Sequence, residues 1–233
     1  MATRPIFCPI LDHGSNVGVV EKMMDFKWHP GMAVSQKQKS IKELHLVAQN
    51  NGIGSILEVS SKSLDELGVS LSAFNLCITT KLKKQSFTVE TAFQGSKVFE
   101  QGGPYLDLIG MDSRAAKKDL RLKESGNLIY FEFFGKKFPN TPRTFFYDWL
   151  YINALVQNQD LAIQVEAYDA FSDIEFNPKK SINCQAYAIA LYVSLAKNGL
   201  LEQALVSPDS FLNLTIKQYE NQLRAKPVQC SMF

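Results

Sequence analysis

A strongly apolar segment near the end of the chain, residues 183–197, constrains the fold more than any other feature. A helix formed from it has to be buried on most of its surface, because it carries almost no charge. Gly199 is suited to end this helix, since glycine readily adopts the backbone conformation found at helix ends. Residues 144–157 and 159–168 also predict helices, and two shorter helices follow Gly199. The second half of the chain is therefore expected to be helical.

The first half of the chain predicts a mixture of elements. Residues 35–50 predict a helix with an apolar stripe, which Asn51-Gly52 ends. Several prolines and glycines interrupt residues 1–30, so this part is expected to be irregular. The remaining predicted elements are helices at 88–99 and 113–123, a helical turn at 63–67 and strands at 56–60, 74–81 and 128–134. Together these elements predict an α+β fold that is mostly α.

The composition is that of an ordinary globular protein. The chain has 233 residues, enough for one large domain with a sizeable core, and 45% of them are hydrophobic and 21% charged. A net charge of +2 is too small to indicate a dedicated nucleic-acid binder. The sequence contains no apolar run long enough to span a bilayer and no signal-peptide pattern at its start. We therefore expect no membrane partner and a cytoplasmic location.

The cysteines and histidines show no metal-binding pattern. The chain has four cysteines without a CxxC pair, and its three histidines are scattered. Neither a metal nor a cofactor is therefore expected. A reducing compartment is the default for such cysteine usage.

The segment from Val89 to Lys97 offers the clearest candidate functional groups. Read as a helix, it places Glu90, Gln94 and Lys97 on one face, because residues three and four apart lie above each other. A carboxylate, an amide and an ammonium are costly to bury without partners or a use. They are suitable groups for hydrolysing a glycosidic bond. The alternative is a partly solvated Glu90–Lys97 pair on an ordinary amphipathic helix.

Several segments of the chain, taken in order, resemble the NADAR superfamily, which contains the riboflavin-biosynthesis-intermediate N-glycosidases. Val89-Glu90 with Gln94 and Lys97 matches the family's Val-Glu-x-x-x-Gln-x-x-Lys helix. Two departures stand out: Ala73 occupies a position where the family has Asn, and the Trp-Gly usual in the acidic loop is absent. The other matching segments are Leu71-Ser72-Ala73-Phe74-Asn75, Ala116-Lys117, Asp148-Trp149, Gln157-Asn158, the acidic loop 169–173 and Asn183.

The resemblance covers about residues 70–197. It implies a single NADAR-like helical domain over residues 70–233, preceded by an N-terminal extension over residues 1–69. It also implies an N-glycoside hydrolase that acts on an ADP-ribosyl or ribosyl bond. Two substrate classes fit, namely ADP-ribose attached to a nucleic-acid base, as in ADP-ribosylated DNA, and a small phosphoribosylamine metabolite.

The resemblance further implies roles for individual residues. Glu90 is the candidate carboxylate beside C1′ of the sugar, where it stabilises positive charge or activates water. Lys97 is a candidate for holding a phosphate or the leaving group. Asp148 is expected to position a hydroxyl or water, and Trp149 to stack on a ring. The candidate ligand-binding residues are Ser72, Asn75, Gln94, Lys117, Arg121, Asp169, Asp173 and Asn183.

Other interpretations of the same residues remain open. Asp148 also fits a role at the start of a helix dipole, Trp149 fits core packing and Asn183 fits a helix cap. Lys117 and Arg121, four residues apart, fit an exposed pair on one helix. The Asn-to-Ala departure at position 73 and the missing Trp-Gly favour a non-catalytic module that binds ADP-ribose or a nucleotide. A role of the helical half in protein interaction is a third possibility.

Overall fold

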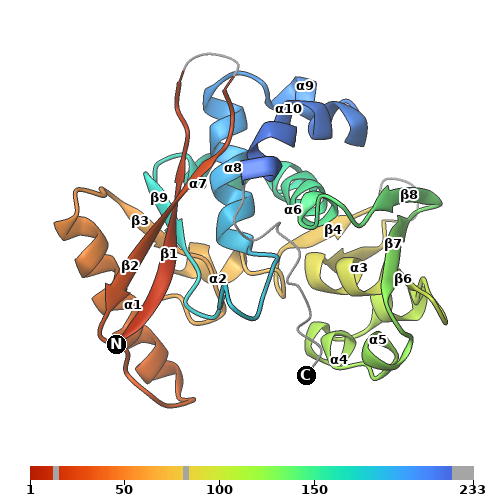
Figure 1. Cartoon of the computed structure of the whole chain (residues 1–233), viewed down its shortest axis with the longest axis horizontal. Helices are drawn as coiled ribbons and strands as arrows, with labels where there is room; N and C mark the ends of the chain where they lie inside the picture. Colours follow the sequence, from red (N-terminus) through yellow and green to blue (C-terminus); the bar gives the residue numbers. More distant parts are fainter. Residues whose placement is uncertain (13–15, 81–83, 222–233) are drawn as a thin grey trace.

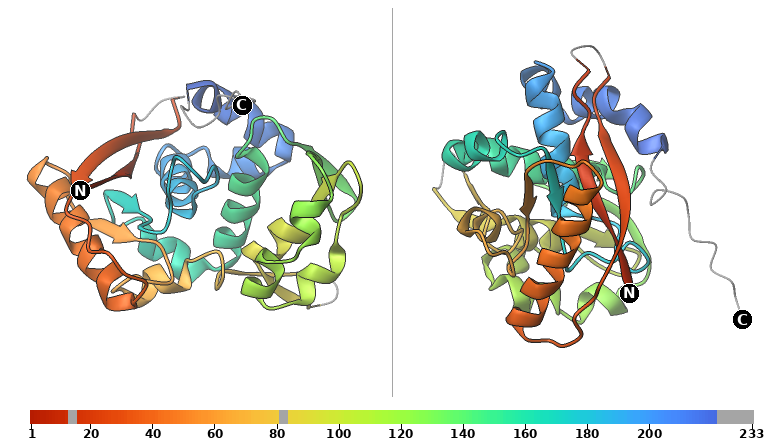
Figure 2. Two further views of the ribbon diagram at one scale, coloured as in Figure 1. Left: turned by 60° about the horizontal axis from the view of Figure 1, so that its bottom comes forward. Right: turned by 90° about the vertical axis from the view of Figure 1, so that its left-hand side faces the viewer.

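Two small sheets flank a central group of helices (Figures 1 and 2). The computed structural model describes residues 1–12, 16–80 and 84–221. Residue 81 of the predicted strand and residues 222–233 of the predicted domain lie outside this part. The described elements confirm an α+β class with more helix than strand. None of the described helices is long and apolar enough to cross a membrane.

The first sheet combines segments from both halves of the sequence. Its strand order is β2-β1-β9-β3, with β1 antiparallel to β2 and β9, and β3 parallel to β9. Helix α1 (Val34–Asn50) covers one face of the sheet. It confirms the helix predicted at residues 35–50. The strands are β1 (Ala2–Pro9), β2 (Val19–Phe26), β3 (Ile56–Glu58) and β9 (Ala170–Ser172).

The predicted irregular structure over residues 1–30 is wrong, because β1 and β2 form a hairpin there. In β1, Ile6 packs into a buried cluster with α1, whereas the ring of Phe7 lies 5.9 Å from that of Tyr187 on the opposite face. A strand that is buried on both faces shows no alternation of polar and apolar residues. The prolines within β1 obscure it further, because proline normally interrupts strands.

The central helices form most of the core. Residues 186–195 of α8 are all buried, which confirms the predicted apolar helix at 183–197. Helix α8 packs against the first sheet on one side and against α6 on the other, and α10 packs on α6. These helices are α6 (Phe145–Gln157), α7 (Gln159–Val165), α8 (Gln185–Lys197), α9 (Leu201–Leu205) and α10 (Pro208–Asn221).

The second sheet and several short helices lie on the far side of α6 (Figure 1). The sheet has the order β6-β7-β8, and a separate hairpin pairs β4 with β5. Helix α3 (Val89–Gly95) packs against α6, α4 and a 3-10 helix η1 (Leu106–Gly110). The remaining elements are β4 (Cys77–Thr79), β5 (Ser86–Thr88), β6 (Lys97–Phe99), β7 (Leu128–Phe133), β8 (Lys136–Pro139), α2 (Glu66–Ser70), α4 (Ser113–Lys117) and α5 (Arg121–Glu124).

Two predicted helices are shorter than expected. The helix predicted at 88–99 ends at Gly95, and Lys97–Phe99 form strand β6 because their backbone pairs with β7. The helix predicted at 113–123 divides into α4 and α5, and between them the carboxylate of Asp119 accepts a hydrogen bond from the backbone of Arg121 at 2.9 Å. Helical periodicity reveals neither the pairing of β6 with β7 nor the break between α4 and α5.

Candidate functional site

Helix α3 holds Glu90 in the interior of the protein. Thr88 caps the helix, since its Oγ1 accepts a hydrogen bond from Thr91 N at 3.2 Å. The backbone N–H of Glu90 donates to Ala73 O at 2.9 Å and ties the helix to the preceding loop. Every residue of α3 is buried, and Glu90 is only 5% exposed. The alternative of a solvated pair on an amphipathic helix therefore does not describe Glu90.

Hydrogen bonds join the predicted groups in a row. Gln94 Nε2 donates to Glu90 Oε1 at 2.8 Å, and Lys97 Nζ donates to Gln94 Oε1 at 2.7 Å. Lys97 reaches Gln94 from strand β6 and not from the helix, so its predicted place on the helix face is wrong although the contact exists. Lys117 of α4 adds a second cation, with its Nζ 3.7 Å from Glu90 Oε1.

The ammonium of Lys97 is partly desolvated. Burial lowers its pKa to about 8, although the negative charge of Glu90 opposes this shift and the positive charge of Lys117 adds to it. Its Nζ also lies 4.7 Å from the centre of the Phe93 ring, a contact that favours the charged form. Lys97 therefore loses its charge at a lower pH than an ordinary lysine.

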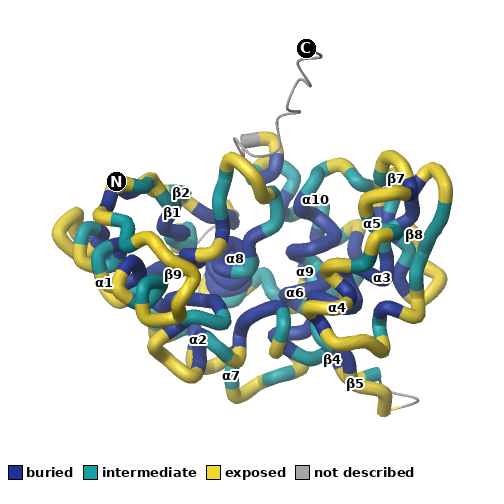
Figure 3. Tube along the Cα trace, turned by 90° about the horizontal axis from the view of Figure 1, so that it is seen from below, coloured by how far each residue is buried: buried dark blue, intermediate teal, exposed yellow. Residues whose placement is uncertain are grey.

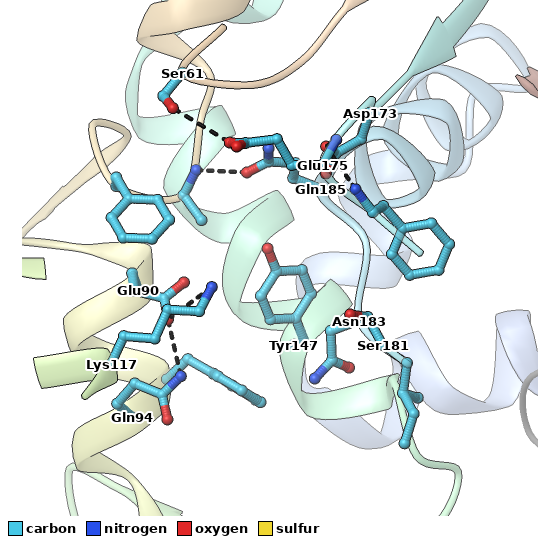
Figure 4. A pocket seen from close by; sticks show the side chains of 15 residues that line it. Ser61, Glu90, Gln94, Lys117, Tyr147, Asp173, Glu175, Ser181, Asn183 and Gln185 are labelled. Atoms are coloured by element: carbon cyan, nitrogen blue, oxygen red, sulfur yellow. Dashed lines mark hydrogen bonds and ion pairs between the residues drawn. The ribbon is translucent and has the colours of Figure 1, made fainter. Parts of the chain in front are cut away.

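Glu90 and Gln94 line a cavity of about 240 Å³ between α3, α4, α6 and the loop that joins β9 to α8. Figure 4 shows Tyr147 of α6 and Asn183 of that loop across the cavity from Glu90. Burial, helped by the negative charge of Glu90, raises the pKa of Tyr147 well above 10, so its hydroxyl remains a hydrogen-bond donor. The wall also includes Ser61, Phe74, Phe176, Ser181 and Gln185.

A second carboxyl group, that of Asp173, lies in the wall away from α3 (Figure 4). Its Oδ1 accepts hydrogen bonds from the backbone of Glu175 at 3.0 Å and Phe176 at 3.1 Å. Burial raises its pKa well above the usual 3.8, and the nearby carboxylate of Glu58 raises it further. Asp173 is therefore suited to carry a proton at a pH where exposed aspartates are ionised.

Glu58 lies behind Asp173 in a buried polar network. Its Oε1 accepts hydrogen bonds from Ser60 Oγ at 2.7 Å and Ile174 N at 2.9 Å, and its Oε2 accepts one from Ser172 Oγ at 2.5 Å. Ser172 also contacts His45 Nε2 at 2.8 Å. This network fixes the strand end that carries Asp173, because each buried polar group in it has a partner.

Gln185, at the start of α8, lines the cavity and makes two hydrogen bonds to the backbone of the first half of the chain. Its Oε1 accepts a hydrogen bond from Ala73 N at 2.8 Å, and its Nε2 donates to Val59 O at 2.6 Å. At position 73, where the NADAR superfamily usually has Asn, the backbone N–H of Ala73 therefore makes the hydrogen bond to Gln185. Gln185 and Tyr147 were not predicted as site residues. A single amide at the head of an apolar helix is a signal that points to Gln185.

The structure brings together Glu90, Gln94, Lys117, Asp173 and Asn183, which all line the cavity. Asn183 does not cap α8, because Cys184 occupies the cap position and makes no side-chain cap bond. The Oδ1 atom of Asn183 is buried and has no hydrogen-bond partner among the described residues. Leaving a buried acceptor unpaired is costly, so a bound group that donates a hydrogen bond would be stabilised here.

Asp148 and Trp149 follow Tyr147 on α6 but face other parts of the protein. Asp148 is fully buried, and its Oδ2 accepts a hydrogen bond from Tyr219 of α10 at 3.2 Å. The ring of Trp149 lies 5.0 Å from that of Phe138, in agreement with the core-packing interpretation. Successive residues of a helix point about 100° apart, so α6 presents only Tyr147 of these neighbours to the cavity.

Three other predicted ligand-binding residues do not line the cavity. Asn75 donates to Val69 O at 2.8 Å, and Asp169 Oδ2 accepts from Ser55 N at 2.8 Å. Ser72 is buried, and its Oγ has no hydrogen-bond partner among the described residues.

Arg121 also lies outside the cavity. It pairs with Asp107 at 2.6 Å and with Asp119 at 2.9 Å. It is on α5, whereas Lys117 is on α4, so these residues do not form the predicted pair on one helix.

Within the described ranges, no group of three or more His, Cys, Asp and Glu side chains is placed to hold a metal ion.

Comparison with known proteins agrees with the resemblance found in the sequence. No curated protein matches the sequence. The sequence profile of a family described as "DarT1-associated NADAR antitoxin" matches residues 2–225, nearly the whole chain. The chain therefore belongs to the family of DarT1-associated NADAR antitoxins.

Proposed function

We propose that this protein hydrolyses the N-glycosidic bond between the ribose of ADP-ribose and a nucleic-acid base. The observation that carries the proposal is the buried carboxylate of Glu90, which faces a cavity beside the ammonium of Lys117 at 3.7 Å. Membership of an antitoxin family named for its association with DarT1 supports a substrate made by a toxin, such as ADP-ribosylated DNA.

The arrangement of the carboxyl groups of Glu90 and Asp173 supports hydrolysis. Cleavage of the C1′–N bond builds positive charge on the sugar and negative charge on the departing base. Glu90 is placed to stabilise the sugar and to accept a proton from the attacking water. Asp173, whose pKa is raised by burial, is placed across the cavity to donate a proton to the base. The water oxygen thus bonds to C1′, and the base leaves with the proton.

Lys117 and Tyr147 complete this assignment. The Lys117 ammonium lies 3.7 Å from Glu90 Oε1 and offsets part of the cost of burying this carboxylate. Lys117 is about half exposed. Its ammonium can therefore move when a ligand enters and still remain hydrated. The Tyr147 hydroxyl supplies a donor for a sugar or base oxygen.

The test is to incubate the purified protein with DNA that carries ADP-ribosyl-guanine, and separately with ribosylamine-type riboflavin intermediates, and to identify the products by mass spectrometry. We expect free ADP-ribose and intact, unmodified DNA from the first substrate only. Glu90→Gln should abolish release, whereas Glu124→Gln, a change at an exposed glutamate of α5, should not. Binding of ADP-ribose with no release by the parent protein would instead identify a non-catalytic module.

A further inference from the structure

A second cavity of about 390 Å³ adjoins the first. Phe93, Ile182 and Asn183 line both cavities, so these side chains lie at the junction between them. The rest of the second wall comes from β6, β7 and the segment just before α6. Its polar members are Lys97, Asn127, Asn140 and Arg143.

The charged side chains that line this second cavity are all positive. Lys97 and Arg143 are its two cations, and no carboxylate of the described residues lines it. Arg143 is half-buried and has no ion-pair partner in the described part of the chain, whereas Arg121 is paired with two aspartates. Two cations beside apolar groups such as Phe131 create a strong positive potential, because the low dielectric there weakens screening.

The asparagines of the cavity differ in what they leave available. Asn127 Nδ2 donates to Glu100 at 3.1 Å, and Asn140 Nδ2 donates to Leu128 O at 2.9 Å, so the structure already uses both amides. Asn183, at the junction of the two cavities, has the buried Oδ1 that lacks a partner among the described residues. A hydroxyl group at the junction would satisfy this acceptor, and an anionic group beyond it would meet Lys97 and Arg143.

The hydrogen-bonded row described above joins the two cavities. Lys97 lines the second cavity, Gln94 accepts its hydrogen bond, and Gln94 donates in turn to Glu90 in the first. An anion that holds Lys97 in place would therefore also hold Gln94 and Glu90 in place.

We propose that the second cavity binds the phosphoryl group attached to the substrate ribose, with Arg143 as a specificity-determining residue. This inference rests on the proposed function, because it assumes that the sugar lies at the junction with its C1′ towards Glu90. It assigns the protein to phosphorylated ribosyl substrates and excludes simple nucleosides. The first cavity then contains the scissile bond, and the second contains the charge that identifies the substrate.

The test is a titration of the full-length protein by calorimetry with ADP-ribose, ribose 5-phosphate and adenosine. ADP-ribose has no base at C1′ and is not consumed. Arg143→Gln should weaken binding of both phosphorylated ligands by about 10- to 100-fold, because a charge-assisted contact is lost. Arg143→Lys should restore part of the affinity. Arg114→Gln, which removes an exposed arginine of α4 outside the cavity, should leave it unchanged.

The two phosphorylated ligands separate the sources of the phosphoryl group. Tighter binding of ADP-ribose supports a diphosphate in the cavity, and equal binding supports a single phosphate from either source. Unchanged affinity in Arg143→Gln, or a preference for adenosine, would overturn the inference. If ADP-ribose binding depends on Arg143 but DNA substrates release nothing, the hydrolase proposal fails while this site stands. If DNA substrates release ADP-ribose but Arg143→Gln has no effect, the hydrolase stands and the phosphoryl site fails.

Discussion

The carboxylate of Glu90 is held away from water but keeps two polar partners, the amide of Gln94 and the ammonium of Lys117. Burying a charge in this way costs several kcal/mol unless partners compensate for it. A protein gains little stability from such a pair, since an apolar residue would pack as well. The arrangement therefore supports the proposal that the carboxylate takes part in a reaction.

The charge of Lys97 should make ligand binding depend on pH. Its ammonium is present below its pKa of about 8 and is lost as the pH rises through that value. The affinity of the parent protein for ADP-ribose should therefore be highest below pH 8 and should fall above it. The charged groups near Lys97 are Glu90, which raises this pKa, Lys117, which lowers it, and Arg143, which lines the same cavity.

Calorimetry across this pH range measures the effect. Lys97→Arg is the matched variant, because arginine stays protonated at every pH used and should remove the dependence. Equal pH dependence in the parent and in Lys97→Arg would show that another group is responsible.

The residues of the site were only partly predictable from the sequence. Glu90 and Gln94 could be found because they carry a charge and an amide at helical spacing, and Asp173 because it lies in the acidic loop of the family resemblance. Asp148 and Trp149 were the residues predicted on α6, but it is Tyr147 that lines the cavity. Nine residues of α6 are buried, so its sequence does not show which side faces a ligand. No motif marks Arg143, whose role depends on the sheet that folds against it.

Among the elements, those with a strong local signal were predicted and those defined by partners were not. Helix α8 follows from an apolar run, because such a run can only be buried. Strand β1 was missed because a helix layer covers each of its faces. Strand β6 was read as a continuation of α3, since the pairing of Lys97 with Phe131 of β7 is a contact distant in sequence.

Helix α2 should tolerate no side chain at Gly68. A Cβ atom there would lie 2.0 Å from Glu58 O and 2.5 Å from Ser63 Oγ, so the backbones of α2 and β3 would have to separate. We expect Gly68→Ala to lower the free energy of unfolding by about 1–3 kcal/mol or more, because overpacking outweighs the better helix propensity of alanine. Urea unfolding measures this change.

The control is Gly110→Ala in η1, where no atom lies within 4 Å of the added Cβ. Its unfolding midpoint should stay close to that of the parent. If both variants unfold at the same urea concentration, the close packing of α2 on β3 is not what the structure indicates.

In the whole molecule, the cavities lie where the second sheet and its helices meet α6 and the loop leading to α8. Figure 3 views the protein from below and shows α8 buried at the centre, with exposed segments around the margins. Strands from the first residues and from the loop before α8 share one sheet, so the start of the chain supports the loop that carries Asp173. Folding of the two halves is therefore coupled.

For the proposed substrate, the net charge of +2 leads us to expect that the ADP-ribose group, and not the DNA, provides most of the binding free energy. Unmodified duplex DNA should bind with a Kd of about 10⁻⁴–10⁻⁶ M at physiological salt, as in non-specific complexes. DNA that carries ADP-ribose should bind Glu90→Gln more tightly. Fluorescence anisotropy measures the affinity for the two DNAs. Equal affinities would contradict the expectation that the ADP-ribose group provides most of the binding free energy.

The catalytic role proposed for Glu90 is tested most directly by the single-turnover rate of ADP-ribose release from ADP-ribosylated DNA, for the parent and for Glu90→Gln at saturating protein. We expect a loss in rate of about 10²–10⁴ in Glu90→Gln, with the affinity for ADP-ribose within a few-fold of that of the parent. Glu124→Gln should retain the parental rate. A Glu90→Gln protein that is folded, binds ADP-ribose and releases it from DNA as fast as the parent would contradict a catalytic role for this carboxylate.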